Sequence, residues 1–160
     1  MGMYNKTLYH RGGPMTFTVY LAGEIHSDWR KELIDKTEER KLPFIFVSPQ
    51  TDHDVSDSIG EEILGEQPND LYKDDKASDI NNFRTQLLMA KADLVIALFG
   101  DKYSQWNTAM DATIAIEKKK PLILIRPHEK SHALKELSNR ANVTVETLDQ
   151  AIQILEYIFK

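Results

Sequence analysis

The sequence contains no cysteine, and this absence excludes several kinds of site at once. Disulfides, metal sites built on thiolates and a cysteine nucleophile all require a residue that the chain lacks. The chain also has no apolar stretch of the roughly 20 residues that a membrane-spanning helix needs. Because nothing indicates an oxidising compartment or a membrane, we expect a cytoplasmic protein.

Glycine is also scarce, and acidic residues outnumber basic ones. A dinucleotide-binding loop needs three spaced glycines after the first strand, where this chain has only Gly23, and no Gly-Lys-Ser/Thr element exists for a phosphate loop. The formal net charge is -5, whereas nucleic-acid binders usually offer a basic surface to phosphates. We therefore expect a small-molecule ligand, with no cofactor, no nucleic acid and no membrane partner.

The composition that is present is ordinary for a folded domain. Hydrophobic residues make up 41% and charged residues 28% of the 160 residues, and one domain of this length can bury a full core. Residues 1–14 are polar and contain glycine, so we expect them to form a flexible leader. The rest, residues 15–160, is predicted to be a single α/β domain.

Five short apolar segments have the composition of strands and alternate with helical patterns. They are Phe17–Leu21, Phe44–Val47, Leu94–Phe99, Leu122–Ile125 and Val143–Val145. Strict alternation predicts a parallel sheet with right-handed crossovers and helices on both faces. A sheet of this size favours a flavodoxin-like, doubly wound fold with strand order 2-1-3-4-5.

Three stretches have the apolar spacing of helices that pack against a sheet. The first runs from about Ser27 to Lys41 and the second from about Ile80 to Lys91, while the third begins at Thr147 and Gln150, which are spaced as a capping box. The residues expected to face inward are Trp29, Leu33 and Ile34, then Ile80, Phe83, Leu87 and Ala90, and finally Leu148, Ala151, Ile152, Leu155, Ile158 and Phe159.

Residues 48–79 are predicted to form a long loop insertion that is partly helical over 60–67. An insertion of this length in a compact domain is usually functional, disordered or a lid. Its acidic stretch 52–57 does not have the spacing of a calcium loop, and no second histidine lies at a zinc-ligand spacing. We interpret the stretch as a solvated turn and expect no metal.

In a sheet of this order the winding reverses between the first and third strands, and the ligand crevice opens at that point. Residues 22–26 and 100–111 should flank it. We therefore expect five polar or aromatic side chains to converge there, namely Glu24, His26, Trp106, Asn107 and Asp111. Gly23 either lets a ligand ring approach the backbone or makes a tight turn after the strand.

Asp111 is the candidate for the chemistry of this crevice. It follows Asn107 by four residues and Thr108 by three, so the three side chains lie on adjoining faces of the expected helix. A carboxylate there can act as a nucleophile, bind ligand hydroxyls, or simply favour the amino end of a helix. Trp106 has two interpretations as well, since it either stacks on a planar ring or covers the core.

Asn82 and Arg84 form a weaker candidate group at the start of the helix expected over 80–91. An amide and a guanidinium near a helix amino terminus either bind an anion or order the long loop before it. The sequence leaves both interpretations open.

Several stretches resemble the nucleoside 2-deoxyribosyltransferase superfamily. They are Tyr20-Leu21-Ala22-Gly23, Lys91 to Leu98, Asn107 to Ala115 and Lys120 to Ile123. Residues 20–30 and 105–109 are similar, more closely still, to the YtoQ group within that superfamily. The resemblance implies a flavodoxin-like fold, attack of a carboxylate on the anomeric carbon of a deoxyribosyl group, and oligomers whose subunits complete one another's sites.

The resemblance also assigns roles to individual positions. It places the nucleophile at Asp111, where the superfamily has the longer glutamate, and puts Tyr20 near the sugar. Ala22 and Gly23 correspond to the backbone segment that lies against the base. Two positions depart from the pattern, because Gln105 and Thr85 stand where the transferases often have acids.

Our leading hypothesis is a nucleoside or nucleotide N-glycosyl enzyme that transfers a 2-deoxyribosyl group to a base or to water. Asp111 is its nucleophile or stabilises the oxocarbenium-like transition state, and Glu24 and His26 are candidates for protonating the departing base. One alternative is a non-catalytic nucleotide or metabolite-binding module on the same fold. Another is a phospho-acceptor receiver domain, suggested by Asp101 just after the third strand.

Overall fold

The computed structural model describes residues 9–10 and 13–160, and its centre is a parallel sheet of five strands. The strands are β3 (Phe17–Gly23), β4 (Phe44–Val47), β5 (Leu94–Leu98), β6 (Leu122–Ile125) and β7 (Val143–Val145). They lie in the order β4-β3-β5-β6-β7, which confirms the predicted order 2-1-3-4-5. Strand β3 continues two residues beyond the predicted end and so carries Gly23 to the edge of the sheet.

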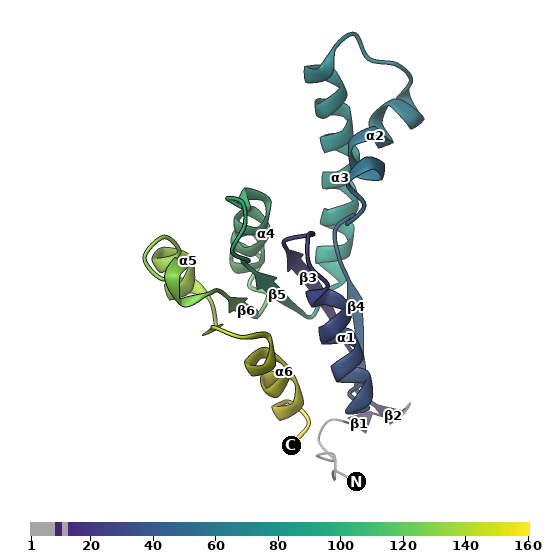
Figure 1. The fold of residues 1–160 in the computed structure, drawn as a ribbon. Coiled ribbons are helices and arrows are strands. Elements are labelled where there is room, and N and C mark those ends of the chain that lie inside the picture. The colour runs from purple at the N-terminus through teal and green to yellow at the C-terminus, as the bar shows by residue number, and fades with distance from the viewer. Residues whose placement is uncertain (1–8, 11–12) are drawn as a thin grey trace.

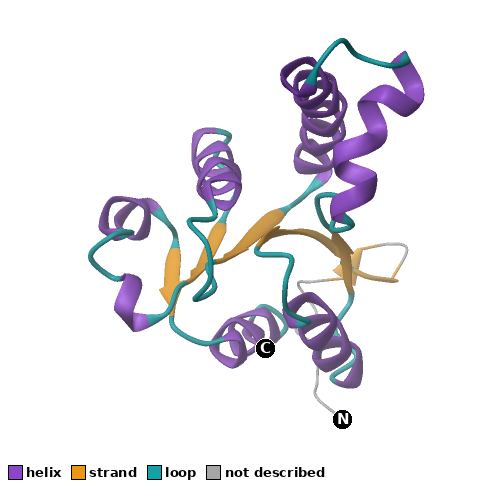
Figure 2. Cartoon of the chain, turned by 45° about the horizontal axis from the view of Figure 1, so that its top comes forward, coloured by secondary structure: helices purple, strands orange, loops and turns teal. Residues whose placement is uncertain are grey.

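Helices cover both faces of this sheet (Figure 2). The helices are α1 (Trp29–Glu39), α2 (His53–Leu64), α3 (Asp70–Lys91), α4 (Trp106–Glu117), α5 (Lys135–Arg140) and α6 (Leu148–Tyr157), with a 3-10 turn, η2, over His128–Lys130. Helices α1 and α6 pack on one face, whereas α4, α5 and the end of α3 pack on the other. The fold is therefore the predicted doubly wound α/β sheet.

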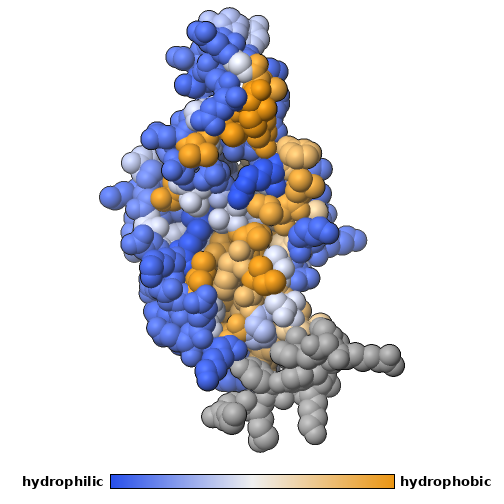
Figure 3. All heavy atoms as spheres, turned by 90° about the vertical axis from the view of Figure 1, so that its right-hand side faces the viewer, coloured by the Kyte–Doolittle hydropathy of each residue, from blue (hydrophilic) through white to orange (hydrophobic). Residues whose placement is uncertain are grey.

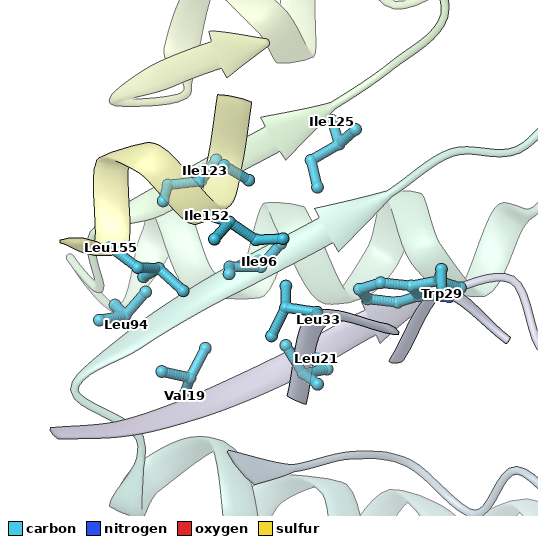
Figure 4. Packing of buried hydrophobic residues seen from close by; sticks show 11 residues of the cluster. Val19, Leu21, Trp29, Leu33, Leu94, Ile96, Ile123, Ile125, Ile152 and Leu155 are labelled. Carbon is cyan, nitrogen blue, oxygen red and sulfur yellow. The ribbon is translucent and has the colours of Figure 1, made fainter. Parts of the chain in front are cut away.

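The core is divided by the sheet into two layers. Val19 and Leu21 of β3 point toward α1 and α6, where Figure 4 shows them with Leu33 and Ile152. The alternate residue Tyr20 and its neighbour Ala22 point to the other side of the sheet, because successive side chains of a strand face opposite ways. On that side Ala112 and Ala115 of α4 are fully buried, so this helix lies close to the sheet.

The first and last helices match their prediction. Trp29 and Leu33 are buried on α1, and the partly buried Ile34 packs beside them. Thr147 and Gln150 form the expected capping box, in which the threonine hydroxyl accepts from the Gln150 backbone N–H at 3.2 Å.

The segment predicted as a long loop, residues 48–79, is instead mostly helical. It forms α2 and the first part of α3, which stand together as a hairpin beyond the end of the sheet (Figure 1). Each helix starts at a side-chain cap: Asp52 accepts from the Val55 backbone N–H at 3.1 Å and Asn69 from that of Tyr72 at 3.2 Å. These caps satisfy amide groups that the first turn of a helix leaves unpaired.

The inward face predicted for the second helix is wrong. Phe83 is 66% exposed and Leu87 is 55% exposed, and Ala90 is exposed as well, while Ile80 is only partly buried. Only the end of α3 lies over the sheet, where Met89 is fully buried. The first part of α3 packs against α2 instead. The position of α3 beyond the sheet therefore decides which side is buried, and local spacing does not reveal that position.

An apolar surface is left on this side of the molecule. We call it the α3 face, and it includes Ile45 of β4 with Phe83 and Leu87 of α3, all more than half exposed. Figure 3 views this side and shows apolar residues gathered along the hairpin and the edge of the sheet.

The leader expected over residues 1–14 lies mostly outside the described residues. Its described part forms two short antiparallel strands, β1 (Tyr9–His10) and β2 (Gly13–Pro14). In the part of the chain that the structure describes, no helix combines the length and the apolar character needed to cross a membrane.

Candidate functional site

A cavity of about 560 Å³ opens where β3 ends, between the loop after β5, the start of α4 and the start of α2. This volume lies within the range of roughly 300–1,000 Å³ that is typical of small-molecule sites. Its lining includes Gly23, Glu24, His26, Gln50, His53, Asp57, Tyr103, Gln105, Trp106, Asn107, Thr108 and Asp111. The five side chains predicted from sheet topology to converge therefore lie around one cavity.

A second cavity of about 530 Å³ adjoins the first on the side of α3. The two share Pro49, Gln50, Ser56, Asp57, Asn107 and Asp111. The second also has a polar wall from α3, made by Asp74, Ser78, Asn81, Asn82 and Thr85. Asp111 thus stands at the junction of an aromatic cavity and a polar one.

The backbone at the end of β3 has no room for a side chain at Gly23. A Cβ there would come within 2.7 Å of the Leu98 carbonyl oxygen and 2.8 Å of the Trp29 ring, and φ is +152°. Arg30 holds the same segment from α1, because its guanidinium donates to the carbonyl oxygens of Leu21 at 3.0 Å, Gly23 at 3.1 Å and Glu24 at 2.8 Å. Sequence reasoning missed Arg30, since nothing in its spacing indicates contact with strand carbonyls.

Glu24 uses its carboxylate within its own turn. It accepts hydrogen bonds from the backbone N–H groups of His26 at 2.6 Å and Ser27 at 3.1 Å, and from the Ser27 hydroxyl. These bonds fix the side chain at the wall of the cavity.

Asp111 is a buried carboxylate with a perturbed proton affinity. Asp111 is 7% exposed. Burial raises the pKa of its carboxyl from the ordinary 3.8 to about 6, and the positive charge of Arg30 opposes this rise. Beside it the Tyr20 hydroxyl is buried without a hydrogen-bond partner among the described residues, although Thr85 lies near it. Burial, together with the negative charge of Asp111, raises the pKa of Tyr20 as well.

Gln105 braces the loop between β5 and α4. Its amide accepts from the Gly100 backbone N–H at 3.0 Å and donates to the carbonyl oxygens of Gly100 at 3.0 Å and Lys102 at 2.8 Å. Gln105 and Tyr103 both have positive φ, at 55° and 66°. The amide that stands in place of an acid of the transferases is therefore used to hold a strained loop.

Aromatic rings form the outer wall of the first cavity. The rings of His26 and Tyr103 lie 4.7 Å apart at 39°. Trp106 also lines the cavity and is 79% exposed, which excludes the interpretation that it covers the core.

The remaining predicted residues fall into two groups. Thr108 is buried and lines the first cavity, and Asn82 lines the second. Tyr20 and Ala22 are fully buried in β3 and line neither. Arg84 lines neither and instead donates to the Ser48 carbonyl oxygen at 2.7 Å, so it orders the segment before α2.

Two residues that were interpreted as part of a solvated turn belong to the cavity wall. His53 and Asp57 lie one helical turn apart on α2, and the imidazole Nδ1 lies 3.0 Å from the Asp57 carboxylate. Their spacing of four residues was visible in the sequence, but it gains meaning only once the segment is known to be helical. No group of three or more potential metal ligands occurs among the described residues.

The doubly wound parallel sheet, with its helices on both faces, is an α/β fold similar to that of deoxyribosyltransferases. The chain belongs to the family described as nucleoside 2-deoxyribosyltransferase YtoQ, whose sequence pattern matches residues 20–159. It is 67% identical over 146 residues to the uncharacterized protein YtoQ of Bacillus subtilis (strain 168), with 91% of this chain and 99% of the relative covered.

Solved structures share the fold at low sequence identity. A 2-deoxyribosyltransferase from Bacillus psychrosaccharolyticus has a TM-score of 0.56 at 18% identity and covers 84% of this chain and 90% of its own. A conserved protein from Enterococcus faecalis V583 has a TM-score of 0.62 at 14% identity, and the match covers 90% of this chain and 99% of that protein. DNA processing protein A from Helicobacter pylori, which binds single-stranded DNA, has a TM-score of 0.50 at 15% identity. That match covers 90% of this chain and 82% of that protein.

Proposed function

We propose that the protein is a nucleoside or nucleotide N-glycosyl enzyme that transfers a 2-deoxyribosyl group to another base or to water. The observation that carries this proposal is the buried Asp111 carboxylate at the junction of two cavities in a chain of this family. A buried carboxylate with a raised pKa in a cleft is typical of functional sites.

The proposed reaction has two displacements. The ionised Asp111 carboxylate attacks the anomeric carbon, the bond from that carbon to the base nitrogen breaks, and a glycosyl-enzyme ester forms. A second base or water then attacks the same carbon and releases Asp111, so that two inversions give net retention. The Tyr20 hydroxyl, buried next to Asp111 without a partner among the described residues, supplies a donor for the carboxylate.

The two cavities suit the two halves of such a substrate. His26, Tyr103 and Trp106 line the first cavity with rings that stack on a planar base. The second cavity has amides and hydroxyls, as at Asn82 and Ser78, which suit the hydroxyl groups of a sugar. Asp111 lies between them, where the anomeric carbon of a bound nucleoside would sit.

The shorter acid is compatible with this arrangement. Ala112 and Ala115 are fully buried, which lets α4 approach the sheet closely, and Asp111 lines both cavities without the extra methylene of glutamate. Because a misplacement of about 1 Å can cost on the order of a hundredfold in rate, we propose that this close packing restores the reach of the carboxylate.

Glu24 takes a different part in the proposal from the one expected from sequence. Three donors of its own turn occupy its carboxylate, so its oxygens are engaged within the turn and not directed at a departing base. We assign it to holding His26 and the turn after Gly23 against the base.

The proposal is tested by incubating the pure protein with a panel of 2′-deoxynucleosides and their 5′-monophosphates, with and without an acceptor base. We expect release of free base, and a loss of roughly a thousandfold or more in Asp111→Ala. Absence of base release over the whole panel contradicts the proposal. Release that is unchanged in Asp111→Ala contradicts the role of Asp111 alone.

The second candidate function is a non-catalytic module that binds nucleotides or metabolites. It is favoured by the use of the Gln105 amide within its loop and by Thr85, since both positions lack the acids of the transferases. Stabilisation against heat by a nucleoside, without any base release, would support it.

The partners that we propose follow from charge and surface. The net charge of -5 favours a small-molecule substrate over nucleic acid, and we propose a cytoplasmic protein. The exposed α3 face favours a homo-oligomer, because large apolar patches usually mark interaction sites.

A further inference from the structure

His53 and Asp57 form a histidine–carboxylate pair on the wall opposite α4. We propose that His53, oriented by Asp57, is the general acid that protonates the departing base. This inference rests on the proposed N-glycosyl function and names the residue that the reaction needs besides its nucleophile.

The pair has the arrangement of a catalytic acid and its positioning group. Nδ1 of His53 lies 3.0 Å from the Asp57 carboxylate, within ion-pair distance, and the two side chains are 67% and 60% exposed. Nε2 has no hydrogen-bond partner among the described residues and is available to a substrate. A carboxylate beside Nδ1 favours the orientation that leaves Nε2 to a substrate, and imidazole exchanges protons near neutral pH.

The location of the pair matches the place of the base. His53 lines the aromatic cavity and does not line the polar one, whereas Asp57 lines both. Asp111 faces the same two cavities from α4, so nucleophile and acid lie on different elements around one space. A leaving base between them would have the attacking carboxylate on the sugar side and an imidazole beside its ring.

Helix α2 is held firmly enough to position this pair. Gly60 packs so closely that a Cβ would meet the backbone N of Ala77 at 2.6 Å, and Asn81 of α3 donates to the Ser56 carbonyl oxygen at 2.9 Å. The contact at Ser56 is next to Asp57 in the chain, and the contact at Gly60 is within one helical turn of it, so both hold α2 against α3 near the pair.

The other candidates for the acid are less suitable. The Glu24 carboxylate is occupied by its turn. His26 stacks on Tyr103, and its ring nitrogens have no carboxylate partner among the described residues. Of the two imidazoles that line the cavity among the described residues, only that of His53 lies within ion-pair distance of an acid.

As the bond between the anomeric carbon and the base breaks, its electron pair goes to the base, and protonated His53 gives its Nε2 proton to a ring nitrogen of that base. In the second displacement neutral His53 accepts the proton that the incoming base or water loses, which restores the starting state.

The test compares two substrates in the wild type and in His53→Gln. 2′-Deoxyinosine needs a proton on its leaving base, whereas 7-methyl-2′-deoxyguanosine carries a positive charge and loses its base as a neutral molecule without one. We expect His53→Gln to lower kcat/KM for 2′-deoxyinosine by about a hundredfold or more and to leave that for the methylated substrate nearly unchanged. Asp57→Asn should show the same selectivity with a smaller loss.

His128→Gln is the matched control, because its Nδ1 lies 3.1 Å from Glu146 in a similarly exposed pair that does not line either cavity. It should leave both substrates unaffected. Equal losses on both substrates in His53→Gln, or no loss on either, would overturn the role of His53 while the proposed function stands. Release of neither base by the wild type would overturn the proposed function and this role with it.

Discussion

Asp111 is kept in a setting that opposes its own charge. Burial raises its pKa to about 6, and Arg30 is the nearby cation that limits the rise. The buried hydroxyl of Tyr20 lies beside it without a hydrogen-bond partner among the described residues. Folding therefore retains a carboxylate at this place at a cost in stability, which is a common property of functional groups.

This cost predicts that Asp111→Asn stabilises the fold in a pH-dependent way. The native pKa of about 6 lies above the ordinary 3.8, so the contribution of Asp111 to stability is present below pH 4 and is lost as pH rises through 6. The gain in unfolding free energy from Asp111→Asn should grow over this range and level off at about 2 to 3 kcal/mol. Denaturant unfolding from pH 4 to 8 measures it.

Asp101→Asn is the control, because Asp101 is an exposed residue of the neighbouring loop. It should give a difference that hardly varies with pH. A gain from Asp111→Asn that is the same at pH 4 and pH 8 would show that ionisation of Asp111 does not oppose folding.

Removing the nearby cation should change Asp111 in a predictable direction. Arg30→Met deletes the positive charge that lowers the Asp111 pKa, so we expect this pKa to rise above 6. Carboxyl titration by NMR measures the change. Arg40→Met removes a cation that is paired with Glu156 on α6, and it should leave the pKa of Asp111 unchanged. An Asp111 pKa that falls in Arg30→Met would contradict the account.

At the scale of elements, much of the sheet could be predicted from the sequence, because short runs such as Leu122–Ile125 are apolar throughout and suit strands buried on both faces. Alternation with helices then predicted the strand order. It also predicted the edge of the sheet where Glu24 and Asp111 line one cavity. The α2–α3 hairpin could not be predicted in this way. Its apolar residues are largely exposed, so they do not follow the pattern of a helix on a core.

The parts of the site that the sequence did not predict depend on tertiary contacts in the same way. Arg30 acts through strand carbonyls, and such contacts leave no pattern in the sequence. His53 and Asp57 depend on where α2 lies, which is a tertiary property. Loop positions such as Gln105 were recognised only as departures from a family pattern, and their bonds became visible in the structure.

The packing of α2 gives a prediction at this scale. Gly60→Ala should weaken the hairpin, because the added methyl would meet the backbone of Lys76 and Ala77 within 2.7 Å, and overpacking typically costs about 1–3 kcal/mol. Hydrogen exchange should become faster over 53–64, and KM should rise. Glu62→Ala on the exposed side of α2 is the control. Unchanged exchange in Gly60→Ala would mean that α2 is not held at this contact.

At the scale of the whole molecule, the α3 face departs from an ordinary monomer surface because large apolar side chains are exposed on it. Phe83 and Leu87 project from α3 and Ile45 is exposed on the edge strand β4. Such a face is costly in water and is covered in most proteins that carry one. A second copy of the chain would cover it and bring another protomer beside the α2–α3 hairpin.

We therefore expect the protein to sediment as an oligomer and the Phe83→Asp/Leu87→Asp double variant to shift to a smaller species while keeping its circular dichroism spectrum. Tyr157→Asp is the control, since Tyr157 is equally exposed but lies on α6. A wild type that sediments as a monomer at all concentrations would remove this assignment.

The most direct measurement of the central claim is the intact mass of the protein after it is mixed with a reactive 2′-deoxynucleoside and quenched in acid. The account predicts an adduct of one deoxyribosyl group that peptide fragmentation locates on Asp111, and no adduct in Asp111→Asn. Base release by the wild type without any adduct, or an adduct that persists in Asp111→Asn, would contradict the claim that Asp111 is the nucleophile.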